Sequence, residues 1–162
     1  MDTPSSSTNS SLALLSQVFR EGTQIPVRYT CKGQNINPPL NVTGVPANAK
    51  SLALIMHDPD AIPVVGFDFV HWLVWDIPSS TETIDTNSVP AGAIQGINGS
   101  GKNQYTGPCP PAGTGTHHYL FELYALDKTL SLKPGASRDQ LQNAMAGHTL
   151  AQHTLTGLFS AD

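Results

Sequence analysis

Charged side chains are scarce in this sequence. Asp, Glu, Lys and Arg make up 12% of its 162 residues, about half of the share that is usual in globular proteins. The eight basic residues are scattered and form no stripe of the kind that nucleic-acid binding requires. Uninterrupted apolar stretches reach only about five residues, far fewer than the ~20 that a membrane-spanning helix needs. The composition therefore argues against nucleic acid as a partner and against a transmembrane segment.

Cysteine is also scarce, and the two examples are Cys31 and Cys109. Both lie in loops rich in Pro and Gly, and their spacing does not show whether the Cα atoms approach within the ~7 Å that a disulfide needs. We expect two reduced thiols, as in proteins of a reducing compartment, with a disulfide as the alternative.

The N-terminus lacks the basic and apolar segments of a secretory leader. Residues 1–11 are rich in Ser and Thr and predict a disordered tail. We expect a single domain over residues 12–162, because this length suits one hydrophobic core. A cytoplasmic location is the default expectation.

Proline and glycine are abundant, with 13 and 14 residues. They separate short runs of apolar, β-branched and aromatic residues that are typical of strands. The best strand patterns cover residues 51–57, 69–77 and 119–126, and weaker ones cover 17–19, 27–30 and 155–159. One helix is expected over residues 137–146, between an N-cap serine and a terminating glycine. The sequence predicts an all-β protein, a β-sandwich with a small helical segment near the C-terminus.

The polar residues of most interest lie at the ends of the three best strand patterns. Asp58 and Asp60 directly follow the first, His71 lies inside the second, and His117 and Tyr119 open the third. A histidine in an apolar strand needs a hydrogen-bond partner, because a buried unsatisfied imidazole is costly. Two such histidines and two carboxylates could satisfy one another and form a compact site that faces an anion.

Strand alternation predicts which side chains share a face with the two histidines. His71 would lie on the face of Phe69, Leu73 and Trp75, and His117 on that of Tyr119, Phe121 and Leu123. A structural interpretation competes with the site: Asp58 caps a turn, His71 is a satisfied core histidine and His117 is a loop residue. The pattern alone leaves both open.

The segment over residues 107–117 leads directly into the third strand pattern. Its prolines fix φ and remove backbone donors, while its glycines allow close approach to a ligand. Free amides in such a loop can bind an anion. The segment therefore predicts one wall of a ligand site, with a proline-stiffened connector as the alternative. The wall residues are Gly107, Pro108, Cys109, Pro110 and Pro111.

Other motifs carry little weight. Residues 96–103 nearly match a phosphate-binding P-loop, but Asn103 replaces the required Ser or Thr and no helix pattern follows. The candidate His and Asp residues lack the spacing of a known metal motif, and a nucleophilic serine elbow is missing. We expect no metal and no cofactor. No role is assigned to His118, His148 or His153, and His57 is placed beside the site.

Three segments of these candidate residues follow one another along the chain in an order that is typical of a known family. They are Asp58-Pro-Asp60-Ala61, Val70-His71-Trp72, and the loop from Gly107 to Tyr119. Supporting stretches lie at residues 29–40, 44–46, 123–127 and 147–150. Together they resemble the phosphatidylethanolamine-binding protein family, most closely its bacterial, Raf-kinase-inhibitor-like branch. The resemblance covers roughly residues 15–160.

This resemblance implies a β-sandwich of two antiparallel sheets with a C-terminal helical segment. It also implies a small anion pocket at one end of the sandwich, which in the family holds phosphate-like groups. Asp58, His71 and His117 would form its polar wall, with Asp60 beside it. Tyr119 would offer its hydroxyl, and residues 107–111 would supply the backbone rim.

Two positions depart from the family's usual pattern. Ile62 precedes Pro63, so the loop after Ala61 is expected to differ. His118 stands where Arg is frequent, which removes a fixed cation and predicts a more pH-dependent ligand affinity.

Two functions are compatible with these residues. The first is a binding or regulatory protein that holds a phospholipid head group, a phosphorylated small molecule or a phospho-residue, and that modulates a kinase or protease. The alternative is a hydrolase acting on a phosphoester or ester with a His/Asp acid–base pair. We favour the first because no nucleophile is identifiable. A homodimer is compatible with the family but has no residue-level support.

Overall fold

The computed structural model describes residues 11–161. The disordered tail expected over residues 1–11 therefore lies outside the described residues, apart from Ser11. The hydroxyl of Ser11 donates a hydrogen bond to the carbonyl oxygen of Gly44 over 3.2 Å.

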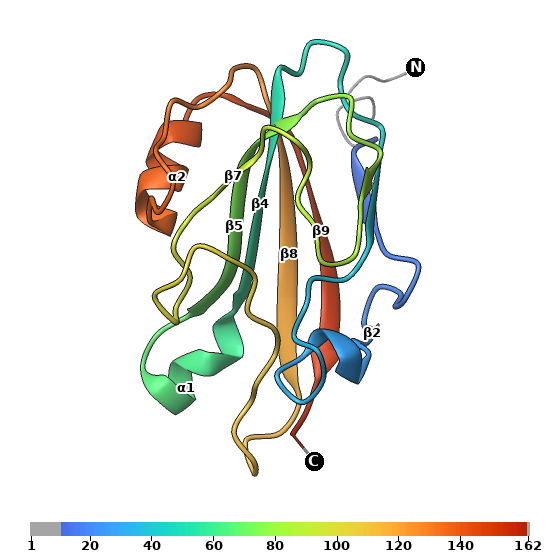
Figure 1. Cartoon of the computed structure of the whole chain (residues 1–162), viewed down its shortest axis with the longest axis vertical. Coiled ribbons are helices and arrows are strands. Elements are labelled where there is room, and N and C mark those ends of the chain that lie inside the picture. The colour runs from blue at the N-terminus through green and yellow to red at the C-terminus, as the bar shows by residue number, and fades with distance from the viewer. Residues whose placement is uncertain (1–10, 162) are drawn as a thin grey trace, which may run out of the picture.

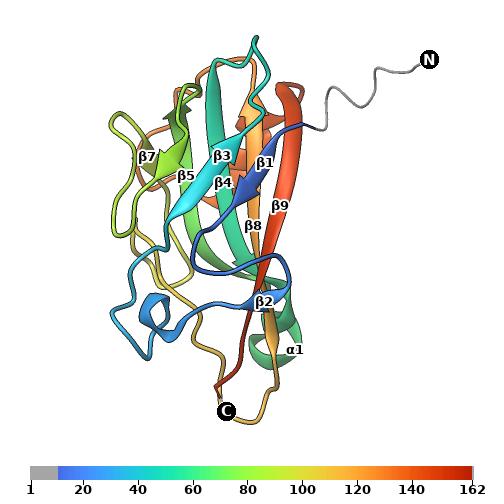
Figure 2. The same ribbon diagram turned by 90° about the vertical axis from the view of Figure 1, so that its right-hand side faces the viewer.

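The described chain folds into two sheets that face each other, as Figures 1 and 2 show. The smaller sheet has the order β1 (Ala13–Leu15), β3 (Leu40–Thr43) and β6 (Thr83–Ile84). The larger sheet has the order β2 (Thr23–Gln24), β9 (Thr149–Phe159), β8 (His117–Leu126), β4 (Ser51–Asp58), β5 (Phe69–Pro78) and β7 (Ile94–Gln95). Neighbouring strands are antiparallel except β2 and β9, which are parallel. The predicted β-sandwich is confirmed.

The larger sheet is covered on both faces. One face packs against the smaller sheet around Leu14, Val42 and Phe121, and the other forms a second core with Trp75 and Leu141. Every residue of β4 is consequently buried. A strand buried on both faces shows no polar alternation, which explains its continuous apolar run in the sequence.

Two helices of very different length accompany the sheets. The predicted helix is confirmed as α2 (Arg138–Met145), where Ser137 and Gln140 form a capping box. The other, α1 (Ile62–Val65), is a single turn that ends at Gly66, where φ is +92°. It follows β4 and the 3₁₀ turn Pro59–Ala61, at the end of the larger sheet where β4 ends (Figure 1). Neither helix in this part of the chain has the length and apolar character that crossing a membrane requires.

Two of the weak strand predictions are wrong. Residues 17 and 18 form a bend and Phe19 belongs to no regular element, because the hydroxyl of Ser16 accepts from the Val18 amide and donates to the Pro39 carbonyl. Residues 27–29 form a 3₁₀ turn, in which the Thr30 amide donates to the Val27 carbonyl over 3.1 Å. The third weak pattern, over residues 155–159, is confirmed as part of β9.

Candidate functional site

The candidate site lies where three neighbouring strands meet at one end of the larger sheet. β4 ends at Asp58, and its antiparallel neighbours β5 and β8 both begin at the same edge. Side chains from the three strands line a cavity of about 300 Å³, and they include Asp58, His71, His117 and Tyr119. The site that the sequence predicted at the strand ends is therefore assembled in space.

A β-bulge in β5 directs His71 toward this cavity. Met56 of β4 pairs with Trp72, while the next residue, His57, pairs with Val70. His71 is the extra residue between the two pairs. A bulge of this kind bends the strand and redirects a side chain, and such bulges are common next to functional sites.

The bulge also changes the faces that alternation predicted. His71 shares the cavity face with Phe69, and the two ring centroids are 4.8 Å apart. Leu73 and Trp75, however, belong to the core on the opposite face. The prediction that they share a face with His71 is wrong, because the extra residue shifts the period-two alternation.

His117 and Asp58 form a buried pair. Nδ1 of His117 lies 2.7 Å from Oδ2 of Asp58. Nε2 of His117 lies 3.0 Å from the Thr114 hydroxyl oxygen, whose own proton is donated to the Pro111 carbonyl. Nε2 must then donate to Thr114, and a second proton lies between Nδ1 and Asp58. The pair as a whole carries no net charge.

Asp58 also caps the turn that follows β4, since its Oδ1 accepts from the Asp60 amide over 2.9 Å. The competing structural interpretation of Asp58 is thus correct, but it accounts for only one of the two carboxylate oxygens. Burial raises the pKa of Asp58, although the hydrogen bond with His117 works in the opposite direction.

His71 is held in a neutral form with a defined tautomer. Its Nδ1 lies 2.7 Å from the carbonyl oxygen of Thr106, which can only accept, so Nδ1 carries the proton. Burial lowers the pKa of His71 to about 4, so the ring is uncharged near neutral pH. Its Nε2 is consequently a hydrogen-bond acceptor.

Tyr119 places a buried hydroxyl beside both histidines. Its ring is edge-on to His71, with centroids 5.2 Å apart, and stacks on His117 at 6.3 Å. The hydroxyl is buried and has no hydrogen-bond partner in the described part of the chain. Burial also raises the pKa of Tyr119, which keeps the hydroxyl protonated as a donor.

The loop after Tyr105 forms the rim of the cavity, with the lining residues Gly107, Cys109, Pro110 and Pro111. Pro108 does not line it, and its carbonyl accepts from the Cys31 amide over 3.1 Å. Gly107 fits closely, because an added Cβ would lie 2.2 Å from the carbonyl oxygen of Tyr29. Its amide donates to Asn35 over 2.7 Å, so it is not available to a ligand.

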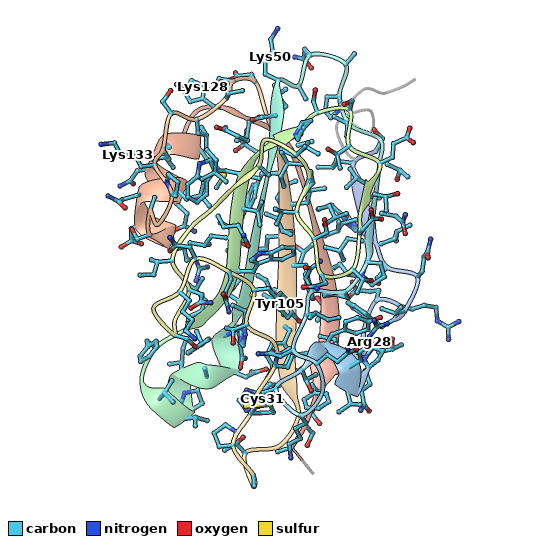
Figure 3. All side chains as sticks on the ribbon, in the orientation of Figure 1. Arg28, Cys31, Lys50, Tyr105, Lys128 and Lys133 are labelled. Carbon is cyan, nitrogen blue, oxygen red and sulfur yellow. A yellow bond between two sulfur atoms is a disulfide. The ribbon has the colours of Figure 1, made fainter. Side chains whose placement is uncertain are left out.

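Cys31 and Cys109 form a disulfide that lines the cavity. The expectation of two reduced thiols is therefore wrong. The loops that carry them pair through the hydrogen bond from Cys31 to Pro108, which brings the two Cα atoms to 5.4 Å. Figure 3 shows Cys31 at the same end of the sheet as α1.

Asp60 lies beside the cavity and does not line it. One of its oxygens accepts from both the amide and the Nδ1 of His118, each over 2.7 Å. Although partial burial acts in the opposite direction, these hydrogen bonds lower the pKa of Asp60. The expected pairing of two histidines with two carboxylates thus holds for one site histidine only, because His71 pairs with a backbone carbonyl.

Several lining residues were not predicted from the sequence: Cys31, Ala61, Val64, Val65, Phe69, Ser100 and Thr106. Phe69 could have been found, because it stands two residues before His71 in the same strand pattern. The carbonyl of Thr106 could not, since no side-chain pattern marks it. The lining contains neither lysine nor arginine.

His57 belongs to a different cluster and not to this cavity. Its Nδ1 lies 2.8 Å from Asp68 and its Nε2 lies 2.9 Å from Glu122. Arg138 contacts Asp68 over 3.0 Å, and Tyr124 donates to Glu122 over 2.8 Å. Burial acts most strongly and opposes the charged imidazolium, but the hydrogen bond with Glu122 and the negative charges of Glu122 and Asp68 together outweigh it and raise the pKa of His57. Among residues 11–161, no three His, Cys, Asp or Glu side chains are grouped so as to hold a metal ion.

The chain is similar over nearly its whole length to proteins of known sequence and structure. A protein designated UPF0098 protein PH1269 from Pyrococcus horikoshii is 48% identical over 151 residues, which are 90% of this chain and 75% of that protein. LppC of Mycobacterium tuberculosis, named a lipoprotein, is 47% identical over 149 residues, with 91% and 72% covered. The crystal structure of a homologue of phosphatidylethanolamine-binding protein from Chlamydia trachomatis has a TM-score of 0.87 at 38% identity and covers 95% of this chain and 99% of its own.

The family model described as phosphatidylethanolamine-binding protein matches residues 15–160. That range includes the whole larger sheet, the disulfide and the whole of the candidate site, and of the smaller sheet it leaves out only the first two residues of β1. This chain belongs to the phosphatidylethanolamine-binding protein family.

Proposed function

We propose that this protein binds phosphate-type anions in the cavity lined by Asp58, His71, His117 and Tyr119. The main support is the Tyr119 hydroxyl, a buried donor without a partner in residues 11–161. Leaving such a group unsatisfied costs about 1–3 kcal/mol, which a ligand oxygen at hydrogen-bond distance would offset. Membership of the family also favours a binding protein over other classes.

The rim supports the same proposal. Three prolines and a disulfide stiffen the loop over residues 107–111, so a ligand that enters this cavity does not first have to order its wall. Preorganisation of this kind raises affinity by lowering the entropy cost of binding. The proposed wall residues are Gly107, Cys109, Pro110 and Pro111, with Pro108 and Asp60 in supporting positions.

Phosphate titration followed by NMR of the imidazole groups tests the proposal. We expect the resonances of His71 and His117 to shift together with a single dissociation constant. His148 pairs with Asp127 outside the cavity and provides an internal control that stays in place. Unchanged His71 and His117 resonances at millimolar phosphate would refute the proposed function.

Contact with a protein partner such as a kinase or protease would use the ridge beside the cavity. Ile62, Val65 and Phe67 are between 48% and 54% exposed, and Val64 is 37% exposed. Because Val64 and Val65 also line the cavity, a residue bound there would place its neighbours against the ridge. A peptide with apolar residues beside a phosphoserine should therefore bind more tightly than phosphoserine alone, and equal affinities would remove this extension.

The hydrolase alternative has one observation in its favour. Thr114, His117 and Asp58 follow one another at hydrogen-bond distances, in the order of a nucleophile, a base and an orienting carboxylate. The Thr114 proton, however, is donated to Pro111, so His117 faces Thr114 as a donor and not as a base. Phosphoester and ester hydrolysis by wild type and His117→Ala separates the two functions, because binding alone predicts equal background rates.

The cytoplasmic location remains a prediction. The Cys31–Cys109 disulfide weighs against it, because disulfides persist mainly in oxidising compartments. Fractionation of cells that produce the natural protein, together with alkylation of free thiols, would test location and redox state at once.

A further inference from the structure

The hydrogen-bonding groups of the cavity can be assigned to donors and acceptors one by one. His71 donates through Nδ1 to the Thr106 carbonyl, so its Nε2 presents a lone pair to any ligand in the cavity. Tyr119 presents a donor, since its hydroxyl proton has no other acceptor in the described chain. One firm acceptor therefore stands beside one firm donor, with their rings 5.2 Å apart.

The remaining polar pair offers no net positive charge. His117 and Asp58 share a proton across 2.7 Å, and Nε2 of His117 already donates to Thr114. No lysine or arginine lines the cavity, and Figure 3 shows Lys50, Lys128 and Lys133 toward the other end of the molecule. A fully ionised anion would lose its hydration without gaining an opposite charge, which is costly in a buried site.

The rim adds few donors. Pro110 and Pro111 have no amide hydrogen, and the amide of Gly107 donates to Asn35. Ser100 and Thr106 also line the cavity, and each of their hydroxyls can either donate or accept. The cavity thus offers a ligand hydroxyl groups but no fixed cation. It also contains one acceptor, Nε2 of His71, whose lone pair would repel the lone pair of an unprotonated ligand oxygen.

We propose that the cavity selects oxyanions that still carry a proton, namely phosphomonoesters and inorganic phosphate, over phosphodiesters and sulfate. The ligand's P–OH donates to Nε2 of His71, and the Tyr119 hydroxyl donates to a second, unprotonated oxygen of the same group. His71 and Tyr119 determine this specificity together. The inference rests on the proposed function and narrows its ligand class.

The surroundings of His71 favour this arrangement over protonation of the ring. Tyr119 and the neutral His117–Asp58 pair share its cavity, while His57 and Asp68 act on it electrostatically from outside the cavity lining. Burial lowers the pKa of His71 to about 4, so a ligand without a proton must bring one from solution to the ring. A ligand that has its own P–OH avoids that step. For sulfate, affinity should increase as the pH falls toward 4, because binding is then coupled to uptake of one proton.

Methyl phosphate and dimethyl phosphate provide a direct comparison. At about pH 5 both are mainly monoanions, because the second pKa of a phosphomonoester is about 6. They match in charge and differ in the presence of a P–OH. Calorimetric titration of the wild-type protein should show methyl phosphate binding at least about fivefold more tightly, since a site built around a ligand hydroxyl rejects the analogue that lacks it.

The results separate this inference from the proposed function. An affinity ratio below about fivefold, or a reversed one, overturns the proton selectivity and leaves anion binding intact. Failure of methyl phosphate, dimethyl phosphate and inorganic phosphate to bind overturns the proposed function, and the inference with it. Neither result depends on a variant that has to fold.

Two variants then locate the selectivity. His71→Gln exchanges the acceptor-only nitrogen for an amide that can also donate, so the ratio should fall to within about twofold. Tyr119→Phe removes a donor that both ligands use and should weaken both alike. His148→Gln, outside the cavity, is the matched control and should keep the wild-type ratio. If a folded His71→Gln variant kept the wild-type ratio of affinities for methyl and dimethyl phosphate, His71 would not be the group that recognises the P–OH proton.

Discussion

A buried hydroxyl without a hydrogen-bond partner is costly in a folded protein, and within residues 11–161 Tyr119 carries one next to two histidines. The contrast with Tyr105 is informative, because that equally buried side chain donates to the Tyr29 carbonyl over 2.7 Å. The same chemical group is satisfied in one place and has no partner among residues 11–161 in the other. This difference supports the proposal that Tyr119 binds a ligand, whereas Tyr105 has a structural role.

Substitution by phenylalanine should separate these two roles. In Tyr119→Phe we expect no loss in the free energy of unfolding of the ligand-free protein, and about a fivefold loss of phosphate affinity. Tyr105→Phe should instead lower the free energy of unfolding by about 1 kcal/mol, because it leaves a buried carbonyl unpaired. Urea unfolding and calorimetric phosphate titration of both variants provide the measurements. Equal effects of the two substitutions would contradict the assignment.

The His57 cluster should make stability depend on pH. The pKa of His57 is raised in the folded state above its ordinary value of 6.5. The stability that it contributes is therefore fully present below about pH 6.5 and is lost as the pH rises through the raised pKa. Glu122→Gln removes the carboxylate that raises this pKa, so it should cost about 1–3 kcal/mol near pH 6 and much less near pH 9.

Urea unfolding of wild type and Glu122→Gln at the two pH values measures this difference. Asp127→Asn is a suitable control, because Asp127 and its partner His148 are both partly exposed to solvent and ion pairs at the surface contribute little. A Glu122→Gln effect of the same size at both pH values would show that Glu122 acts through packing and not through the charge of His57.

At the residue scale, the sequence indicates which polar residues lie together where a side chain itself carries the signal, while their role in binding stays a prediction. Asp58, His71, His117 and Tyr119 stand out as polar residues at strand ends, and the fold brings them into one cavity. The hydrogen-bond partner of His71 could not be predicted from the sequence, because the Thr106 carbonyl is a backbone group common to every residue type. The bulge at His71 was also invisible, since an inserted residue leaves no mark in the composition of a strand.

At the scale of elements, the loop over residues 107–111 joins the site to the disulfide. Cys31 and Cys109 are 78 residues apart in the sequence, so their bond closes a long loop and restricts the unfolded chain. We expect Cys31→Ser/Cys109→Ser to lower the free energy of unfolding by about 2–4 kcal/mol. Because the same residues line the cavity, phosphate affinity should also fall.

Guanidinium unfolding with and without a dithiol reductant tests this prediction. Reduced wild type should unfold at the concentration found for the double variant, which itself should not respond to the reductant. A reductant effect on the variant, or none on wild type, would contradict a structural disulfide in solution.

Element prediction failed mainly for short segments held by local hydrogen bonds. The long runs that became β4, β5 and β8 were found because hydrophobic burial on a sheet dominates them. The segment at residues 27–30 has strand-like composition, yet a 3₁₀ turn follows Pro26 and the Thr30 hydroxyl bonds to Val27 over 2.8 Å. Turn chemistry of this kind overrides composition when a run is only four residues long.

At the scale of the whole molecule, the cavity is built on the three most buried strands and not on peripheral loops alone. Asp58, His71 and His117 each belong to a long strand of the larger sheet, which is packed on both faces. A ligand that contacts all three therefore binds only the folded chain. Binding to the native state alone stabilises it by mass action, by about 2.7 kcal/mol when the ligand is at 100 times its dissociation constant.

Phosphate at 100 times its dissociation constant should therefore raise the free energy of unfolding of the wild-type protein by about 2.7 kcal/mol. Backbone hydrogen exchange in β4, β5 and β8 should slow together. His117→Ala should lose most of the effect, because it removes the partner that holds Asp58. Lys128→Gln removes a cation toward the opposite end of the molecule and should keep the effect in full, as Figure 3 indicates. If phosphate protected both variants equally, it would be acting on the surface as a stabilising salt and not in the cavity.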